Sequence, residues 1–236
     1  STGNKVLYAR WLAELTVTLD YNDGKTPSSS FVVIEGNSYG INLPTPEREG
    51  YTFVGWYTNL EGGTKKTSTD IVTNSHTLYA RWAGVSYTLN INSSYISVKR
   101  GTEVLSNGAA IYKDDVLTIT YSRNGYDSAT VYANEVALAS SEYTVGSGNV
   151  TLTINNEIAT NYSITYNLDG GTNNEGNPTT YTINSPTITL LNASKSGYQF
   201  VGWYTEPTGG TKVESITSGS TGNKVLYARW LAELTV

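Results

Sequence analysis

One short motif in the sequence matches a catalytic pattern. Gly36–Gly40 (GNSYG) fits the G-x-S-x-G turn that carries the nucleophile of many serine hydrolases. In those enzymes a strand precedes the serine, a helix follows it, and a histidine serves as its base. The chain has a single histidine, His76, and Pro44 prevents a helix from growing directly after the motif. We therefore expect a hairpin end here, and no enzyme activity.

Acidic residues at two places could bind calcium. The segment Asp20–Gly24 (DYNDG) has part of a calcium loop, but its spacing departs from D-x-[DN]-x-[DN]-G and the acidic residue at loop position 12 is missing. The pair Asp114-Asp115 fits the solvated entrance of a strand. Turn chemistry explains both segments better, so we expect neither a metal site nor a cofactor.

Aromatic side chains are the third candidate, because tyrosine and tryptophan faces can stack on sugar rings. The chain has 19 tyrosines and 5 tryptophans. Most tryptophans recur at fixed positions inside alternating strands, which favours a structural core over a binding surface. The predicted core comprises Tyr51, Phe53, Trp56, Trp82, Tyr126, Tyr198, Phe200, Trp203 and Trp230. If a glycan is bound, the loop or strand-edge residues Tyr39, Tyr95 and Tyr143 are better candidates.

The elements that carry these residues are repeated along the chain. The first seventeen residues, Ser1–Val17, return unchanged as Ser220–Val236, which indicates a window from a longer tandem array. Within it, Gly50–Tyr57 (GYTFVGWY) and Gly197–Tyr204 (GYQFVGWY) are each followed by a GGTK turn and a closing LYARW segment. A third LYARW lies at 7–11. Identical closing strands predict end-to-end self-association, by exchange of Ser1–Trp11 with Ser220–Trp230.

The segment 83–160 has no tryptophan, but it keeps the spacing of the repeats. Its Gly125-Tyr126 is followed six residues later by Tyr132, and Val131 stands at the position of Trp56 and Trp203. We predict residues 12–82 as one repeat and 161–230 as another. Residues 83–160 form a diverged repeat or a distinct β-domain, 1–11 close a preceding repeat and 231–236 open a following one.

Composition excludes several classes of protein. The net charge of −5 and the lack of a Lys/Arg run argue against nucleic-acid binding. The absence of cysteine excludes disulfides and thiolate metal sites. No apolar run approaches the ~20 residues of a membrane-spanning helix, so we expect no membrane insertion.

Alternating hydrophobicity predicts a mainly β fold. Val17, Leu19 and Tyr21 alternate with polar residues before a turn at Asn22–Gly24, and Ile164–Leu168 repeats the pattern. The FVGWY segments are apolar on both faces, which predicts strands covered on both sides. In LYARW, Leu78, Ala80 and Trp82 share one face, and Tyr79 and Arg81 share the other. A short helix or helical turn could fit only before each GY motif, for instance at Thr45–Glu49. Short connections between units predict a semi-rigid, elongated rod.

The GY-x-F-x-GWY motif, the GGTK turn and the LYARW segment together resemble the internalin-type B-repeat, or Listeria–Bacteroides repeat. The likeness covers about 15–82 and 162–230. It implies small β-grasp-like units in tandem, exported to the bacterial cell surface, where they space or support adhesive domains. It implies no catalytic residue. A structural or adhesive stalk, contacting neighbouring repeats, is the expected function, and a repeated module that binds a glycan or a host protein is the alternative.

Overall fold

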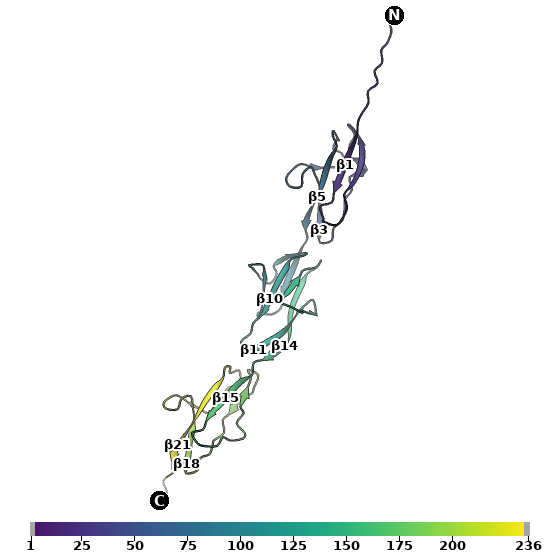
Figure 1. Ribbon diagram of the computed structural model, residues 1–236. Helices are drawn as coiled ribbons and strands as arrows, with labels where there is room; N and C mark the ends of the chain where they lie inside the picture. The colour runs from purple at the N-terminus through teal and green to yellow at the C-terminus, as the bar shows by residue number, and fades with distance from the viewer. Residues whose placement is uncertain (1–2, 234–236) are drawn as a thin grey trace. The chain divides into compact units, whose positions relative to one another are not determined.

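The computed structural model describes residues 3–233 and is mainly β (Figure 1). Among these residues the helical structure is limited to one 3-10 turn, Gly40–Asn42. The described part of the chain contains no helix with the length and hydrophobicity to cross a membrane. Two compact units are present. The first comprises the chain up to Thr88 with Ala109–Val116 and Thr144–Asn149, and the second comprises the remainder.

The first unit is built on a five-stranded sheet in the order β2-β1-β5-β3-β4. The first and last strands, β1 and β5, are parallel neighbours in its middle, and all other pairs are antiparallel. The strands are β1 (Glu14–Asp20), β2 (Ser29–Ile34), β3 (Tyr51–Tyr57), β4 (Lys65–Lys66) and β5 (His76–Gly84).

The alternation of hydrophobic residues correctly predicts which face of this sheet is buried. Val17 and Leu19 of β1 and Leu78 and Ala80 of β5 are all buried in one core cluster. The turn after β1 is also as expected, because Asn22 adopts a positive φ of 47°, a conformation that asparagine tolerates better than most residues. Sequence pattern therefore determines the inward face of both central strands.

The FVGWY segment differs from the prediction that both of its faces are covered. Val54 of β3 is 37 % exposed and its counterpart Val201 is 42 % exposed. The register of β3 against β5 shifts between Phe53 and Gly55, as in a β-bulge. A bulge inserts one residue and breaks the period-2 alternation, so Phe53 and Trp56 can pack together although they are three residues apart.

The short helix or helical turn that could fit at Thr45–Glu49 is absent from that segment. The 3-10 turn lies earlier, and Arg48 instead forms an isolated bridge with Tyr51. Pro44 and Pro46 explain the difference, because proline restricts the residue before it to extended conformations.

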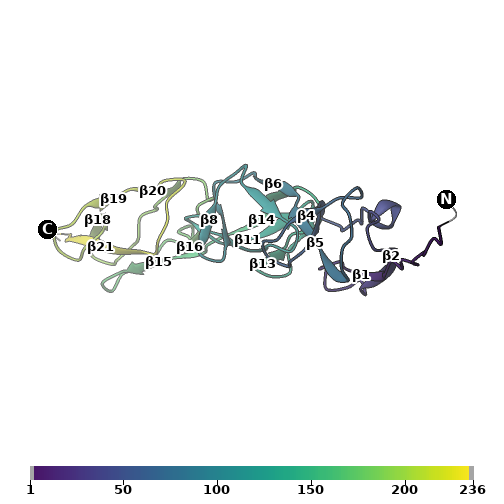
Figure 2. The ribbon, with the colours of Figure 1, turned by 90° about the horizontal axis from the view of Figure 1, so that it is seen from above.

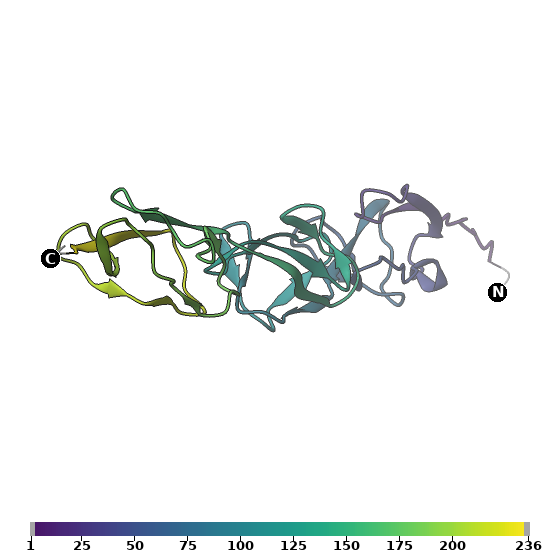
Figure 3. The same cartoon turned by 90° about the horizontal axis from the view of Figure 1, so that it is seen from below.

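The second unit contains a sheet with the same organisation, β16-β15-β21-β18-β19. Its first and last strands, β15 and β21, are again parallel neighbours. Figures 2 and 3 show β21 beside β18 from opposite sides. The strands are β15 (Tyr162–Asn167), β16 (Thr180–Tyr181), β18 (Tyr198–Tyr204), β19 (Lys212–Val213) and β21 (Lys224–Ala232), with a separate pair β17 (Ile188–Thr189) and β20 (Ser215–Ile216).

The middle of the chain contributes to both units. In the first unit, β6 (Ser86–Ile91) pairs through its first half with β9 (Ala110–Tyr112). In the second unit, its last half runs parallel to β14 (Val150–Ala159), which pairs with β11 (Tyr126–Ala133), and β11 pairs with β12 (Val136–Ala137). The resulting order, β9-β6-β14-β11-β12, matches strand for strand the order of the other two sheets.

This segment also carries strands that the flanking repeats lack. They form a four-stranded sheet in the order β13-β10-β7-β8, and Leu117 and Ile119 of β10 are buried. The strands are β7 (Ile96–Arg100), β8 (Glu103–Leu105), β10 (Val116–Tyr121) and β13 (Glu142–Thr144). The domain boundaries inferred from the sequence stay a prediction.

The LYARW sequence adopts two different states. In β21 it is a strand, and Leu226 is 3 % exposed. At 7–11 it forms no strand, and Trp11 is 89 % exposed. The first two residues of the predicted exchange segment Ser1–Trp11 and the last three of 231–236 lie outside the described residues.

Candidate functional site

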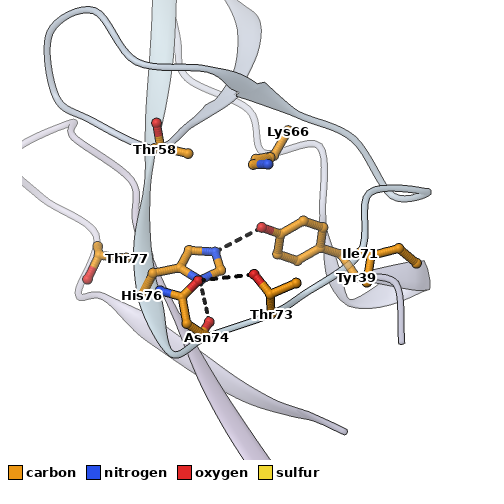
Figure 4. Close-up of a pocket in the computed structure, with 8 residues that line it drawn as sticks. All are labelled: Tyr39, Thr58, Lys66, Ile71, Thr73, Asn74, His76 and Thr77. Atoms are coloured by element: carbon orange, nitrogen blue, oxygen red, sulfur yellow. Dashed lines mark hydrogen bonds between the residues drawn. The ribbon is translucent and has the colours of Figure 1, made fainter. Parts of the chain in front are cut away.

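A tyrosine–histidine pair lies at a pocket in the first unit (Figure 4). Tyr39 is buried, and its hydroxyl lies 2.8 Å from His76 Nε2. His76 Nδ1 lies 2.7 Å from the carbonyl oxygen of Asn74. A carbonyl oxygen can only accept, so Nδ1 of a neutral His76 carries the proton and Nε2 accepts the Tyr39 hydroxyl hydrogen. Both ring nitrogens therefore have a partner.

The pocket has a volume of about 230 Å³ and a mostly polar wall. Burial raises the pKa of the Tyr39 hydroxyl, and Asp70 raises it further. The phenol is therefore neutral near pH 7 and acts as a hydrogen-bond donor. The other lining residues are Thr58, Lys66, Ile71, Thr73, Asn74 and Thr77.

The serine of the GNSYG motif is not the partner of the histidine in this arrangement. Ser38 forms an isolated β-bridge with Ile71, and the residue after it, Tyr39, bonds to His76. A single 3-10 turn follows the motif where a hydrolase needs a helix. The position of His76 is taken by Lys224 in the last repeat, and its ammonium donates to the Thr221 carbonyl. The Tyr39–His76 pair is thus a feature of one repeat.

The acidic segment after β1 is organised as a turn. Asp23 accepts hydrogen bonds from the backbone amides of Lys25 and Thr26 and from the Thr26 hydroxyl. These bonds, led by the Thr26 hydroxyl, lower the pKa of Asp23 to about 2. Asp115 similarly accepts from the Tyr112 amide at the entrance of β10. Residues 3–233 contain no cluster of three or more histidine or acidic residues placed to hold a metal.

Each tryptophan of the two clear repeats donates a hydrogen bond from its indole nitrogen to a backbone carbonyl outside its own strand. Trp56 and Trp203 are buried, and their Nε1 atoms donate to the carbonyls of Pro44 and Leu191 at 2.7 and 2.9 Å. Trp82 and Trp230 are half-buried and donate to Tyr21 and Leu168 at 2.8 and 3.0 Å. A buried indole N–H needs such an acceptor, so the bonds position the loop as well as the ring.

Phenylalanines bridge these rings. Phe53 meets Trp56 and Trp82 edge to face at centroid distances of 5.6 and 5.4 Å. Phe200 meets Trp203 and Trp230 at 5.3 Å each. The tyrosines of the predicted core lie further out: Tyr51 and Tyr126 are half-buried, and Tyr198 is 40 % exposed.

A cation stacks on the tyrosine of all three GY motifs, a feature that the sequence reasoning missed. The Arg48 and Arg123 guanidinium carbons lie 3.9 and 4.3 Å from the Tyr51 and Tyr126 centroids, and Lys195 Nζ lies 4.5 Å from that of Tyr198. In each motif the tyrosine amide donates to the carbonyl of this basic residue. The signal was present in the sequence as [KR]-x-G-Y, three times.

In the middle segment this cation also bonds to a carboxylate. Arg123 Nη1 lies 2.5 Å from Glu157 Oε2, and the Tyr121 hydroxyl donates to Glu157 Oε1 at 2.8 Å. The Arg123 bond and then the Tyr121 bond lower the pKa of Glu157. Burial and then the Glu157 bond raise the pKa of Tyr121 to about 12.

The tyrosines proposed for glycan stacking are placed differently from one another. Tyr39 is a wrong candidate, because its ring is buried. Tyr95 is 38 % exposed, and the Arg123 guanidinium carbon lies 4.6 Å from its ring centroid. Tyr143 is half-buried in β13.

Comparison with known proteins agrees with the repeated geometry. The model of the Listeria-Bacteroides repeat domain matches residues 16–81 and 162–229. A "Putative membrane protein" of Evansella cellulosilytica is 27 % identical over 95 % of the chain, and a "Putative Gly-rich membrane protein" of the same organism is 26 % identical over 96 %. The chain spans 33 % and 26 % of the length of these relatives.

Proposed function

The chain belongs to the Listeria-Bacteroides repeat family, and on that basis we propose that it is a non-catalytic, force-bearing spacer of a tandem-repeat protein on the bacterial cell surface. Its repeats follow one another as an elongated series that holds another part of the protein away from the cell. The names of the two much longer relatives, which contain the words "putative" and "membrane protein", support this location. Each sheet is a β-grasp-like unit in which an irregular segment replaces the helix.

The strand order of the sheets is the observation that carries the proposal. In all three, the strand that enters the sheet and the strand that leaves it are parallel neighbours in the middle: β1 with β5, β6 with β14, and β15 with β21. Tension applied through the chain pulls the start of the first strand and the end of the last strand in opposite directions. The hydrogen bonds between parallel strands then resist shear together and do not open one at a time.

The aromatic network strengthens the same sheets. Trp82 and Trp230 lie on the last strands and bond to the chain that follows the first strands, at Tyr21 and Leu168. These bonds connect the two force-bearing strands a second time, outside the ladder.

Pulling the chain by its ends in a single-molecule force experiment tests the proposal. We expect separate unfolding events, each of which releases on the order of 20 nm of chain for a unit of this size. A featureless extension at low force would contradict it.

Two further roles stay predictions. Binding of a glycan or host protein would make the emission of exposed aromatic residues respond to that ligand, whereas a spacer predicts no response. Exchange of Ser1–Trp11 with Ser220–Trp230 between molecules predicts oligomers at high concentration, and a strict monomer in sedimentation at millimolar concentration would contradict it.

A further inference from the structure

Glycines of two [KR]-x-G-Y turns are covered by the segment that follows them in the chain. In the first unit, a Cβ atom on Gly50 would lie 2.4 Å from Lys113 Cδ. In the second unit, a Cβ atom on Gly125 would lie 2.6 Å from Ile183 Cδ1 and 3.3 Å from Thr221 Cγ2. All three GY glycines have positive φ, but at Gly50 and Gly125 the close neighbour also excludes any side chain.

The covering residues occupy equivalent positions. Lys113 and Ile183 each lie two residues after the buried residue of the second strand, Ile111 and Tyr181. In the first repeat that buried residue is Val33, so the equivalent position is Glu35.

A second position recurs at the closing strand. Ser147 and Thr221 each lie three residues before the first residue that pairs in the parallel ladder, Val150 and Lys224. Ser147 Oγ donates to Glu49 Oε1 at 2.6 Å, and Lys113 Nζ lies 3.6 Å from Glu49 Oε2. In the first repeat the ladder begins at His76, and the equivalent residue is Thr73.

The third turn lacks such a cover. Nothing lies within 4 Å of a Cβ atom built on Gly197, and Ser196, Gly197 and Tyr198 are all exposed. By contrast, Gly50 is half-buried and Gly125 is buried. Glu35 and Thr73, the positions that would cover a preceding turn, are exposed as well. We call a GY turn together with the residues that cover it a joint. On this chain the Ser196–Tyr198 turn has no cover, and the covering positions Glu35 and Thr73 are exposed.

We propose that the Ser196–Tyr198 turn is a docking surface for the first repeat of a following copy of this sequence, which covers Gly197 with Glu35 and Thr73. The identity of 231–236 with 12–17 makes such a repeat the occupant, because the sequence after the last closing strand is the start of the first repeat. The two surfaces are chemically complementary. Ser196 stands at the position of Glu49, and Glu35 stands at the position of Lys113. The Ser196 hydroxyl can therefore donate a hydrogen bond to the Glu35 carboxylate of the following copy.

This inference rests on the proposed function, in which repeats follow one another in tandem. Cysteine trapping in a lengthened chain tests it. The chain has no cysteine, so introduced pairs report only on themselves. Residues 18–84 are appended after Val236, and Ser196→Cys is combined with Glu35→Cys in the appended repeat. The matched positive control is Glu49→Cys with Lys113→Cys, which occupies the same two positions in the existing joint.

We expect the test pair to close to a disulfide under mild oxidation as completely as the positive control, because docking would give the two pairs the same separation, and closure depends on how near the Cβ atoms lie. The pair Ser196→Cys with Glu47→Cys in the appended repeat should close about tenfold more slowly, because Glu47 is exposed and lies beside the turn that meets the end of β5, not its start. Failure of the test pair where the positive control closes would overturn the docking surface. It would leave the spacer role intact, because the pulling experiment reports on each sheet by itself.

Discussion

Val17 in the first strand and His76 in the last strand of the first repeat are partners in a parallel ladder. The same relationship joins Leu89 to Val150 and Ile164 to Lys224. The residue types at these positions differ, whereas the pairing of entering and leaving strands is the same three times. The topology that supports a mechanical role therefore extends to the middle segment, which lacks the aromatic signature of the flanking repeats.

Replacement of a core tryptophan should destabilise its own repeat. Trp203 is 2 % exposed and donates to Leu191, so Trp203→Ala should cost about 3–5 kcal/mol through the lost contacts and the cavity left behind. The control Trp11→Ala removes an 89 % exposed ring and should change the stability by less than about 0.5 kcal/mol. Calorimetric unfolding measures both, and equal effects would refute the core assignment.

Acidification should weaken the folded state. The pKa of Asp23 is lowered to about 2, and the pKa values of Asp70 and Glu157 are lowered by hydrogen bonds to Thr67 and Arg123. A depressed pKa in the folded state contributes stability above the ordinary value near 4, and that contribution disappears as the pH falls through the folded value. Urea midpoints should therefore drop mainly between about pH 4 and pH 2.

The variant Asp23→Asn is the control for this acid effect. It removes the carboxylate that accepts the Lys25 and Thr26 bonds, so it should lower the urea midpoint at pH 7 and flatten the decline below pH 4. A decline as steep as that of the unmodified chain would mean that Asp23 takes no part.

The elongated rod that the sequence predicts would have a large radius of gyration. A compact globule of this length would have a radius of gyration of about 18 Å. Small-angle scattering of the monomer should give a value well above that, and a value near 18 Å would contradict the extended arrangement.

Much of the sheet could be predicted from the sequence, and the exceptions have physical causes. Alternation identified Val17 and Leu78 as inward residues, since the period of a strand depends only on the backbone. The prediction that both faces of the FVGWY segment are covered failed at Val54, which is exposed. The bulge at Phe53–Gly55, which depends on the partner strand, brings Phe53 and Trp56 together instead.

The candidate site was harder to foresee. Tyr39 was expected at the surface, but its hydroxyl bonds to His76, a residue 37 positions away, and no local pattern reports such a contact. The stacking of Arg48, Arg123 and Lys195 was readable as [KR]-x-G-Y, although only the three-dimensional structure shows what the cation contacts.

The direction of pulling on one repeat tests the force-bearing role most directly. Glu14 and Ile34 are paired across the antiparallel β1 and β2, so handles at these two positions open that ladder one bond at a time. Handles at Glu14 and Gly84, the start of β1 and the end of β5, load the parallel ladder in shear. The chain has no cysteine, so two double variants provide the handles. Glu14→Cys with Ile34→Cys pulls along the first direction, and Glu14→Cys with Gly84→Cys pulls along the second. We predict a clearly higher unfolding force for the Glu14–Gly84 pair, and equal forces in the two directions would contradict the account.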